Sequence, residues 1–313
     1  MTSAEHTTGP STDDSSTTPV DVIRPGRPIE FLSGEQILLR GWLRLPAGSG
    51  PHPLVILAHG FGGLHTWHLP NIAATFVESG FAALAFDYRN FGESDGTPRE
   101  EVDAPGQIVD WQSAITFATT LDEIDANRIG IWGTSHGGKN VLIVAAFDRR
   151  VRCVVAQCPA IDWGETVLLH QNNADQRQEL MTALDEDRLT RFAGGEPTYV
   201  NLDVVGAGPR FLESLSPNDR RTWPGRLTLR SYEPTVASNA RPFMHMIAPT
   251  PLLMIVADAD ITAPLPMALE AYAAAREPKS LFYISGGHED VYFSPLLDTA
   301  SEAAAEWFKR HLA

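Results

Sequence analysis

The sequence has few cysteines, no long apolar runs and few basic residues, and each of these scarcities argues against one class of protein. Only 2 of the 313 residues are cysteine, which argues against a disulfide-stabilised scaffold. No apolar run approaches the roughly 20 residues of a membrane-spanning helix. Lys and Arg number 24 against 39 Asp and Glu, a formal net charge of −15. We therefore expect neither nucleic-acid nor membrane partners, because both are anionic.

Residue spacings typical of metal sites are also missing. Neither a CxxC nor an HExxH pattern occurs, and His65 and His68 are only a weak pair of candidate ligands. Cys153 and Cys158 lie five positions apart on one apolar run, so an extended strand points them to opposite faces. We expect two free buried thiols, no metal and no cofactor.

The N-terminal tail lacks the large apolar residues that a folded segment needs. Ten of residues 1–18 are Ser or Thr, a composition typical of disorder. The tail has neither a basic start nor an apolar core, so it does not resemble a secretory signal. We expect a disordered tail over residues 1–22 and a cytoplasmic protein, and the sequence leaves the oligomeric state open.

What the sequence does have is an alternation of apolar runs with helical patterns, which predicts one mostly parallel sheet covered on both faces. Two apolar runs that precede these strands predict an edge hairpin. Residues 162–248 interrupt the alternation and predict a mainly helical cap inserted into the fold. The core then comprises residues 23–161 and 249–313. The predicted strands are 54–58, 82–86, 128–133, 151–157, 252–257 and 280–284, with the hairpin at 29–32 and 36–45.

The most informative motif is G-T-S-H-G at residues 133–137, directly after the apolar run 128–132. A strand that turns sharply into a helix lifts its serine into a strained, exposed position, and flanking glycines avoid collisions with the neighbouring strand or helix. The apolar run 141–146 supplies the helix. The motif predicts a nucleophile elbow with Ser135 as the nucleophile.

A serine nucleophile needs a histidine to take its proton and an acid to orient that histidine. In this architecture the order is serine, acid, histidine, each at the carboxyl end of a strand. His288 follows the run 280–284 and two glycines, which makes it the expected base. Asp258 and Asp260 both follow the run 252–257 and compete for the role of the acid.

The third requirement is a pair of backbone N–H groups that bind the oxyanion of the tetrahedral intermediate. The run 54–58 leads into H-G-F-G-G at residues 59–63, the turn from which one donor comes in this architecture. The other donor belongs to the residue after the nucleophile. The predicted donors are the N–H groups of Phe61 and His136.

With these motifs the chain resembles the serine-dependent α/β-hydrolase superfamily over most of its length beyond residue 28. Residues 87–96, 125–133 and 249–257 make it similar to dienelactone-hydrolase-like esterases and to the polyketide transferases and thiohydrolases of secondary metabolism. The resemblance implies that the chain hydrolyses a carboxylic ester, lactone or thioester through an acyl-enzyme. The alternatives are acyl transfer by the same triad and, more remotely, a non-catalytic binding protein.

Residue types at the nucleophile and acid positions refine this resemblance. Dienelactone hydrolases proper use cysteine where this chain has Ser135, so their lactone substrate is not carried over. Related sequences place the acid four residues before a proline, and Asp260 stands four residues before Pro264. We therefore prefer Asp260 over Asp258, and Asp162 is the outside alternative because some relatives carry the acid after the preceding strand.

Large apolar side chains near the turn and in the predicted cap are candidates for binding a small-molecule acyl substrate. The ring-rich stretch 64–68 departs from the pattern expected of the superfamily. Apolar residues at helical spacing are more often packing residues than pocket residues. The candidates are Trp67, Trp163, Leu168, Phe211, Trp223, Phe243 and Met244.

Overall fold

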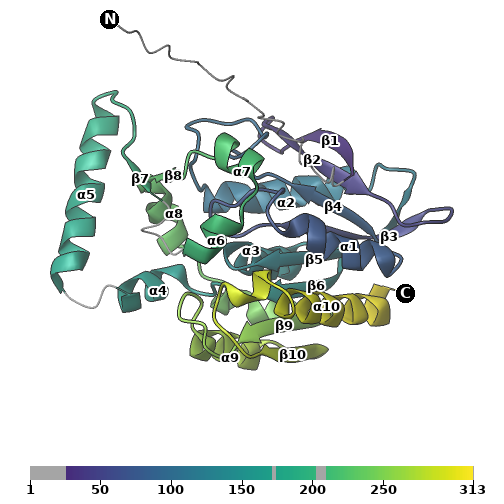
Figure 1. Cartoon of the computed structure of the whole chain (residues 1–313). Coiled ribbons are helices and arrows are strands. Elements are labelled where there is room, and N and C mark those ends of the chain that lie inside the picture. The colour runs from purple at the N-terminus through teal and green to yellow at the C-terminus, as the bar shows by residue number, and fades with distance from the viewer. Residues whose placement is uncertain (1–25, 171–173, 202–208, 313) are drawn as a thin grey trace, which may run out of the picture.

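The computed structural model describes residues 26–312 except 171–173 and 202–208, so the predicted tail over residues 1–22 lies outside the described residues. Eight strands form one sheet in the order β1-β2-β4-β3-β5-β6-β9-β10 (Figure 1). The strands are β1 (Arg27–Leu32), β2 (Leu38–Arg44), β3 (His52–Ala58), β4 (Ala82–Phe86), β5 (Ile124–Thr134), β6 (Val151–Gln157), β9 (Leu252–Ala257) and β10 (Lys279–Ile284).

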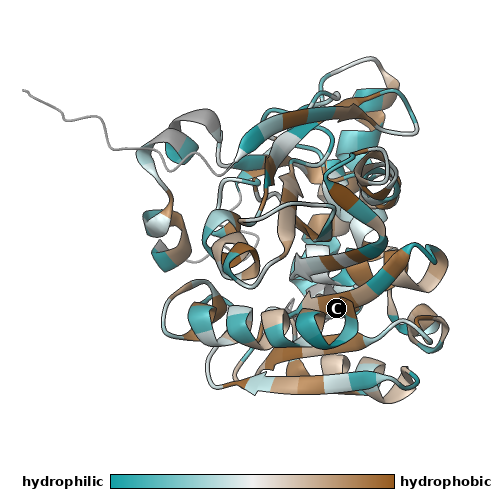
Figure 2. Cartoon of the chain, turned by 90° about the vertical axis from the view of Figure 1, so that its right-hand side faces the viewer, coloured by the Kyte–Doolittle hydropathy of each residue, from teal (hydrophilic) through white to brown (hydrophobic). Residues whose placement is uncertain are grey.

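The sheet is parallel except at one edge. β1 pairs antiparallel with β2, which also pairs antiparallel with β4, and every other neighbouring pair is parallel. The six predicted parallel strands and the edge hairpin are confirmed. Buried parallel strands are covered on both faces and therefore read as continuous apolar runs. Figure 2 shows hydrophobic residues concentrated on these strands.

Helices cover both faces of the sheet. On one face α1 (Leu69–Glu78) packs against α10 (Leu296–Leu312). On the other face α2 (Ala104–Ala118) packs against α3 (His136–Phe147), and α9 (Leu265–Ala274) lies against β9. A short 3₁₀ helix, η4 (Asp290–Tyr292), packs against α10. The fold is therefore the three-layered α/β arrangement that the sequence predicts.

The chain between β6 and β9 forms what we call the β6–β9 segment (residues 162–248). A bridge joins its first residue, Asp162, to Asn239 near its end, and the two side chains also hydrogen-bond. The segment also holds a two-stranded antiparallel ribbon that the sequence did not predict. Its elements are α4 (Trp163–His170), α5 (Ala174–Phe192), β7 (Tyr199–Asn201), α6 (Pro209–Ser214), α7 (Pro217–Thr222), β8 (Arg226–Thr228), η2 (Leu229–Ser231), α8 (Tyr232–Val236) and η3 (Arg241–Met246).

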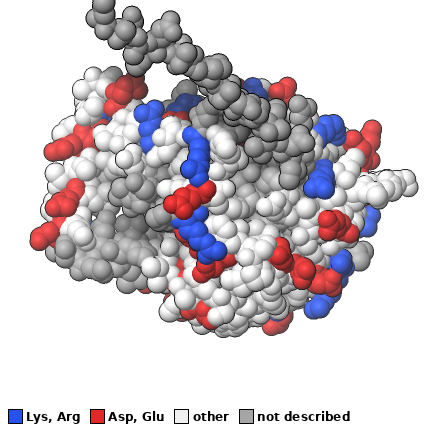
Figure 3. Space-filling view, in the orientation of Figure 1, with Lys and Arg blue, Asp and Glu red and all other residues white. Residues whose placement is uncertain are grey.

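The surface carries charges of both signs. On the face shown in Figure 3, Lys and Arg side chains are interspersed with Asp and Glu. Within the part of the chain that the structure describes, no helix combines the length and the apolar character needed to cross a bilayer.

Candidate active site

The turn from β5 into α3 places Ser135 in a strained backbone conformation, with φ 55° and ψ −119°. A Cβ atom on Gly133 would stand 2.3 Å from the carbonyl oxygen of Gly137. A Cβ atom on Gly137 would stand 2.4 Å from the carbonyl oxygen of His59. Both distances are far below van der Waals contact. The two glycines therefore allow β5, α3 and the turn at residues 59–63, which we call the oxyanion turn, to pack closely against one another. The sequence motif therefore has the geometry of a nucleophile elbow.

Three predicted side chains lie in one hydrogen-bonded row at the carboxyl ends of β5, β9 and β10. His288 Nε2 lies 3.0 Å from Ser135 Oγ, and His288 Nδ1 lies 2.7 Å from Asp260 Oδ2. These strands run parallel, so their carboxyl ends meet at one edge of the sheet. The arrangement matches a nucleophile, a general base and an acid that orients the base.

Asp260 is held in place by its own loop. Its Oδ1 accepts hydrogen bonds from the N–H groups of Thr262 and Ala263 at 2.9 and 2.7 Å, which leaves Oδ2 for the histidine. The Asp260 side chain is 1% exposed and that of His288 is 10% exposed. These contacts fix the orientation of the carboxylate toward His288, as expected of an acid that orients the base.

The other two aspartates have different partners. Asp258 Oδ1 accepts from the N–H of Gly286 at 2.9 Å, which ties the loop after β9 to the loop that carries His288. Asp162 Oδ1 accepts from the N–H of Glu165 at 2.9 Å, and its second oxygen accepts from Asn239. Among these three aspartates, Asp260 is therefore the one that contacts the histidine.

The H-G-F-G-G turn after β3 lies directly against Ser135, the predicted nucleophile. A Cβ atom on Gly60 would stand 3.0 Å from Ser135 Cβ. The Gly60 N–H donates to His59 Nδ1 at 2.7 Å, and burial lowers the pKa of His59 to about 3, so its ring remains neutral. Within the described chain, the N–H groups of Phe61 and His136 have no hydrogen-bond partner. Both are therefore free to bind an oxyanion.

A buried polar network beneath the elbow is the feature that sequence reasoning missed. His136 Nε2 lies 2.9 Å from Gln107 Oε1, which also accepts from Asn140, and His136 Nδ1 lies 3.3 Å from Lys139 Nζ. Lys139 is fully buried, and burial lowers the pKa of its amine to about 7. Burial and this neighbouring amine hold the pKa of His136 well below its usual value. The network fixes His136, whose N–H is one of the two predicted oxyanion donors.

The Phe61 side chain is surrounded by rings. It stacks on Trp163 with ring centroids 5.5 Å apart and meets the edges of His136 and Tyr232 at 5.6 and 6.3 Å. The structure thus brings Trp163, a predicted pocket residue, beside the oxyanion turn. Tyr232 was not predicted, because an isolated tyrosine in a polar stretch carries no distinguishing signal.

Trp67 belongs to a second aromatic cluster, between the body of the protein and the β6–β9 segment. Its ring lies 5.6 Å from that of His59, 4.8 Å from that of Trp223 and 5.9 Å from that of Phe211. Tyr292, in the 3₁₀ helix after His288, stacks on His59 at 5.9 Å. The ring-rich stretch 64–68 therefore anchors the segment beside the oxyanion turn.

Two of the predicted pocket residues make packing contacts in the described structure. Phe243 packs against Phe147 at 5.1 Å, at the opposite end of α3 from Ser135. That helix has 12 residues and so spans about 18 Å. Met244 is fully buried in the hydrophobic core. Both are packing residues, and the Leu168 side chain lies outside the described residues.

Comparison with known proteins places this geometry in a family. The model of the α/β-hydrolase fold matches residues 53–295, which include the oxyanion turn and all three hydrogen-bonded side chains. The chain belongs to the α/β-hydrolase family. The resemblance seen in the sequence is confirmed, including its similarity to polyketide transferases and thiohydrolases.

Three relatives of this α/β-hydrolase align over nearly the whole chain. It is 32% identical to the polyketide transferase grgF of Penicillium sp, covering 92% of this chain and 98% of the relative. It is 31% identical to the quorum-quenching protein AidA of Acinetobacter baumannii, covering 90% and 94%. It is 30% identical to the thiohydrolase aneE of Aspergillus aculeatus, covering 91% and 93%. The crystal structure of GrgF from Penicillium sp. sh18 superposes with a TM-score of 0.79 at 29% identity, covering 91% of this chain and 98% of that chain.

Proposed function

We propose that this α/β-hydrolase is a serine hydrolase that cleaves a carboxylic ester, lactone or thioester through an acyl-enzyme. The observation that carries the proposal is the row from Ser135 Oγ through His288 to Asp260, with separations of 3.0 and 2.7 Å. A serine held this close to a histidine can lose its proton as it attacks, which is the activation that acyl transfer requires.

The acylation step uses each group in turn. Ser135 Oγ attacks the carbonyl carbon while His288 Nε2 takes the hydroxyl proton, and the carbonyl electron pair moves to oxygen. The N–H groups of Phe61 and His136 bind the resulting oxyanion. When the carbonyl re-forms, the leaving alkoxide or thiolate takes the proton from His288. Asp260 holds the His288 ring in place and stabilises the imidazolium.

Deacylation decides between hydrolysis and transfer. If water attacks the acyl-enzyme with His288 as base, the product is a free acid, and if an alcohol attacks, the product is a new ester. The names polyketide transferase and acyltransferase of two relatives support transfer as the second candidate, whereas the name thiohydrolase of a third supports hydrolysis. Only acceptor access and water exclusion separate the two outcomes.

We further propose that the β6–β9 segment covers the site and contacts the acyl group. The support is the stacking of Trp163 and the edge contact of Tyr232 on Phe61, because both rings come from this segment. A largely apolar wall with a few polar groups suits an acyl chain. Trp163 and Tyr232 then replace Phe243 and Met244 as residues that affect acyl selectivity.

Covalent labelling tests the proposal most directly. A fluorophosphonate should modify Ser135 in the wild type and leave Ser135→Ala unlabelled, as read by intact mass and peptide mapping. A panel of esters, lactones and acyl thioesters then identifies the leaving group. An unlabelled wild type that turns over no substrate would instead support a non-catalytic binding protein.

A partition experiment separates hydrolysis from transfer. The acyl-enzyme is generated from an activated ester, and the ratio of acid to new ester is measured as a primary alcohol is added. A hydrolase gives acid at every alcohol concentration, whereas a transferase gives increasing amounts of new ester.

A further inference from the structure

Cys158 lies next to the proposed acid, and the reaction proposed above does not use it. It follows the last residue of β6, its backbone φ is 40°, and it is 2% exposed. Its N–H donates to the carbonyl of Ile255 on β9 at 2.7 Å, which fixes the residue beside the strand that leads to Asp260. Burial and the nearby carboxylate of Asp260 raise the pKa of the Cys158 thiol well above its usual value.

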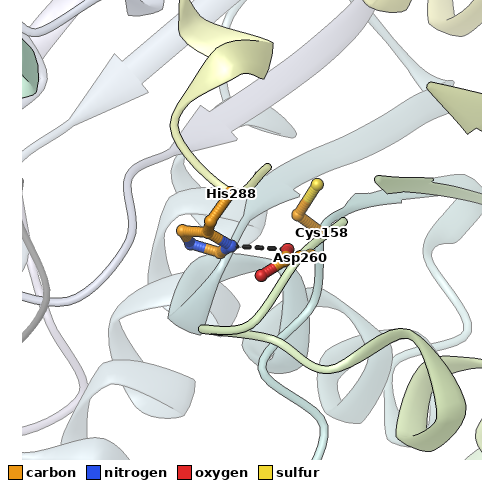
Figure 4. A group of neighbouring side chains, drawn as sticks. All are labelled: Cys158, Asp260 and His288. Atoms are coloured by element: carbon orange, nitrogen blue, oxygen red, sulfur yellow. Dashed lines mark hydrogen bonds and ion pairs between the residues drawn. The ribbon is translucent and has the colours of Figure 1, made fainter. Parts of the chain in front are cut away.

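Cys158, Asp260 and His288 are neighbouring side chains, and a hydrogen bond joins Asp260 to His288 (Figure 4). A thiol sulfur, a carboxylate oxygen and an imidazole nitrogen all lie within 4.8 Å of one another. The donors come from the ends of three neighbouring strands, β6, β9 and β10. In tetrahedral zinc sites the bonds are about 2.0–2.3 Å long, so ligand atoms stand roughly 3.3–3.8 Å apart. Small side-chain movements would bring these three donors to that spacing.

We propose that Cys158, Asp260 and His288 form an inhibitory binding site for a thiophilic divalent cation such as Zn²⁺ or Cd²⁺. Sulfur, imidazole nitrogen and carboxylate oxygen together are a donor set that Zn²⁺ accepts and that Mg²⁺ or Ca²⁺ does not favour. The binding part of the proposal stands on these three side chains alone, and the inhibitory part rests on the proposed function.

Charge balance favours the metal-bound state in this buried place. The thiol loses its proton on binding, so a thiolate and the Asp260 carboxylate together neutralise the two positive charges of the cation. A lone buried thiolate beside a carboxylate is unfavourable because the two negative charges repel each other and lack solvent. The cation removes that repulsion. It therefore lowers the free energy needed to deprotonate Cys158.

Binding would remove the base from the reaction. The resting triad has a proton on His288 Nδ1, shared with Asp260, and an unprotonated Nε2 that faces Ser135. A cation bound at Nδ1 displaces that proton, and the neutral ring then carries its proton on Nε2. Nε2 can no longer accept the Ser135 proton, so the net release is one proton from the thiol and activity is lost.

Cadmium titration with matched cysteine variants tests the site. The chain has two cysteines, both free and buried, so Cys153→Ser is the control for Cys158→Ser. Chelator-treated wild type and Cys153→Ser should develop the ultraviolet charge-transfer band of a cadmium–thiolate bond at one equivalent. Cys158→Ser and Cys158→Ala should not, with apparent Cd²⁺ affinity lowered at least about 10- to 100-fold. Loss of the band in Cys153→Ser alone would overturn the proposal.

Two further measurements distinguish binding of the cation from its effect on catalysis. Ser135→Ala retains all three donors, so it should show the same band and the same cadmium-dependent rise in Tm as the wild type. In the wild type, Zn²⁺ should lower the rate of ester hydrolysis, and a chelator should restore it. A band in Ser135→Ala with no turnover of any acyl substrate by the wild type would retain the site and remove the proposed function. A wild type without the band, or with full activity when saturated with Cd²⁺, would overturn the inhibitory site.

Discussion

Helices α3 and α5 show how differently two parts of this chain are constrained. In α3 every residue except Ile143 and Phe147 is buried, and the buried residues include Lys139. Among the described side chains of α5, Leu184 and Asp187 are buried and the rest are half-buried or exposed. Figure 1 shows α5 projecting from the body, whereas α3 lies against the sheet.

The difference in burial follows from the groups that each helix positions and from how much of the protein it packs against. α3 begins directly after Ser135, the proposed nucleophile, and its first residue carries a proposed oxyanion donor, so displacement of its first turn would change the geometry of these groups. α5 has few partners, and its Phe192 is 93% exposed. We therefore expect substitutions to have large effects around the start of α3 and small effects along α5.

The largest effect is expected from removing the nucleophile or the base. Ser135→Ala and His288→Ala should each lower kcat on the order of 10⁶-fold, with the double variant little worse than either single variant, because the two groups act as a unit. Steady-state kinetics on an activated ester measures the cycle. Nearly additive losses, or a loss below about tenfold for Ser135→Ala, would contradict the assignment.

The acid should have the next largest effect. Asp260→Asn keeps the shape of the side chain but no longer stabilises the imidazolium, so kcat should fall by about 10³- to 10⁴-fold with folding intact. Asp258→Asn is the matched control, because Asp258 hydrogen-bonds a backbone N–H of the neighbouring loop. A collapse in kcat of the Asp258 variant, with Asp260→Asn above about a tenth of wild type, would reverse the assignment.

The oxyanion turn separates a backbone effect from a side-chain effect. Phe61→Pro removes one N–H donor and should lower kcat about 10²-fold or more. Phe61→Ala retains the N–H and should mainly change acyl preference, because the ring contacts Trp163. The ratio of wild-type to variant kcat, measured on substrates of increasing acyl length, reports both the loss of rate and the change in acyl preference. Equal losses in two folded variants would mean that the ring has the catalytic role.

Burial of Lys139 predicts a pH dependence of stability. The pKa of its amine is lowered to about 7 from 10.5, so between these values the unfolded chain binds a proton that the folded chain does not. Stability therefore rises with pH across this window, by up to about 1.4 kcal/mol per pH unit. Urea unfolding at pH 7, 8 and 9 should show the wild type gaining stability relative to Lys139→Met.

The exposed Lys309 of α10 supplies the control for that measurement. Its side chain is 46% exposed and pairs with Glu306, so Lys309→Met should follow the wild type across the same pH range. Parallel pH profiles for the wild type and Lys139→Met would show that the amine is charged in the folded protein.

The same substitution made in each helix gives the sharpest contrast between α3 and α5, and the smallest expected effect is the one in α5. Leu142 on α3 is 1% exposed and Leu189 on α5 is 69% exposed. Leu142→Ala should lower the free energy of unfolding by about 2–5 kcal/mol, because it leaves a cavity. Leu189→Ala should change it by less than about 0.5 kcal/mol. A large loss at Leu189 would indicate that α5 has a partner in solution.

Much of the body of the protein could be predicted because a parallel sheet constrains it. The strands β4, β6 and β9 begin and end at the predicted residues, since buried strands are continuous apolar runs. The same register brings the ends of β5, β9 and β10 together, so Ser135 and His288 could be placed by their order alone. The spacing to Pro264 favours Asp260 over Asp258 in the sequence, whereas the contact of Asp260 with His288 depends on the path of a loop and is seen only in the structure.

Other features were not predictable from the sequence. Phe243 and Met244 look like pocket residues because an apolar side chain reads the same in a pocket and in the core. Lysine is typical of the protein surface, and the burial of Lys139 depends on tertiary packing that the sequence does not reveal. The ribbon of β7 and β8 consists of three-residue strands, which are too short to show an alternating pattern.

The bridge between Asp162 and Asn239 has a consequence for how proteins of this kind diversify. Because the chain leaves the body and returns to it at neighbouring points, the length and content of what lies between can change without moving β5, β9 or β10. The segment that we propose contacts the acyl group can therefore be exchanged while Ser135, Asp260 and His288 remain in register. The same property makes the two ends of this loop suitable points for grafting the corresponding region of a relative.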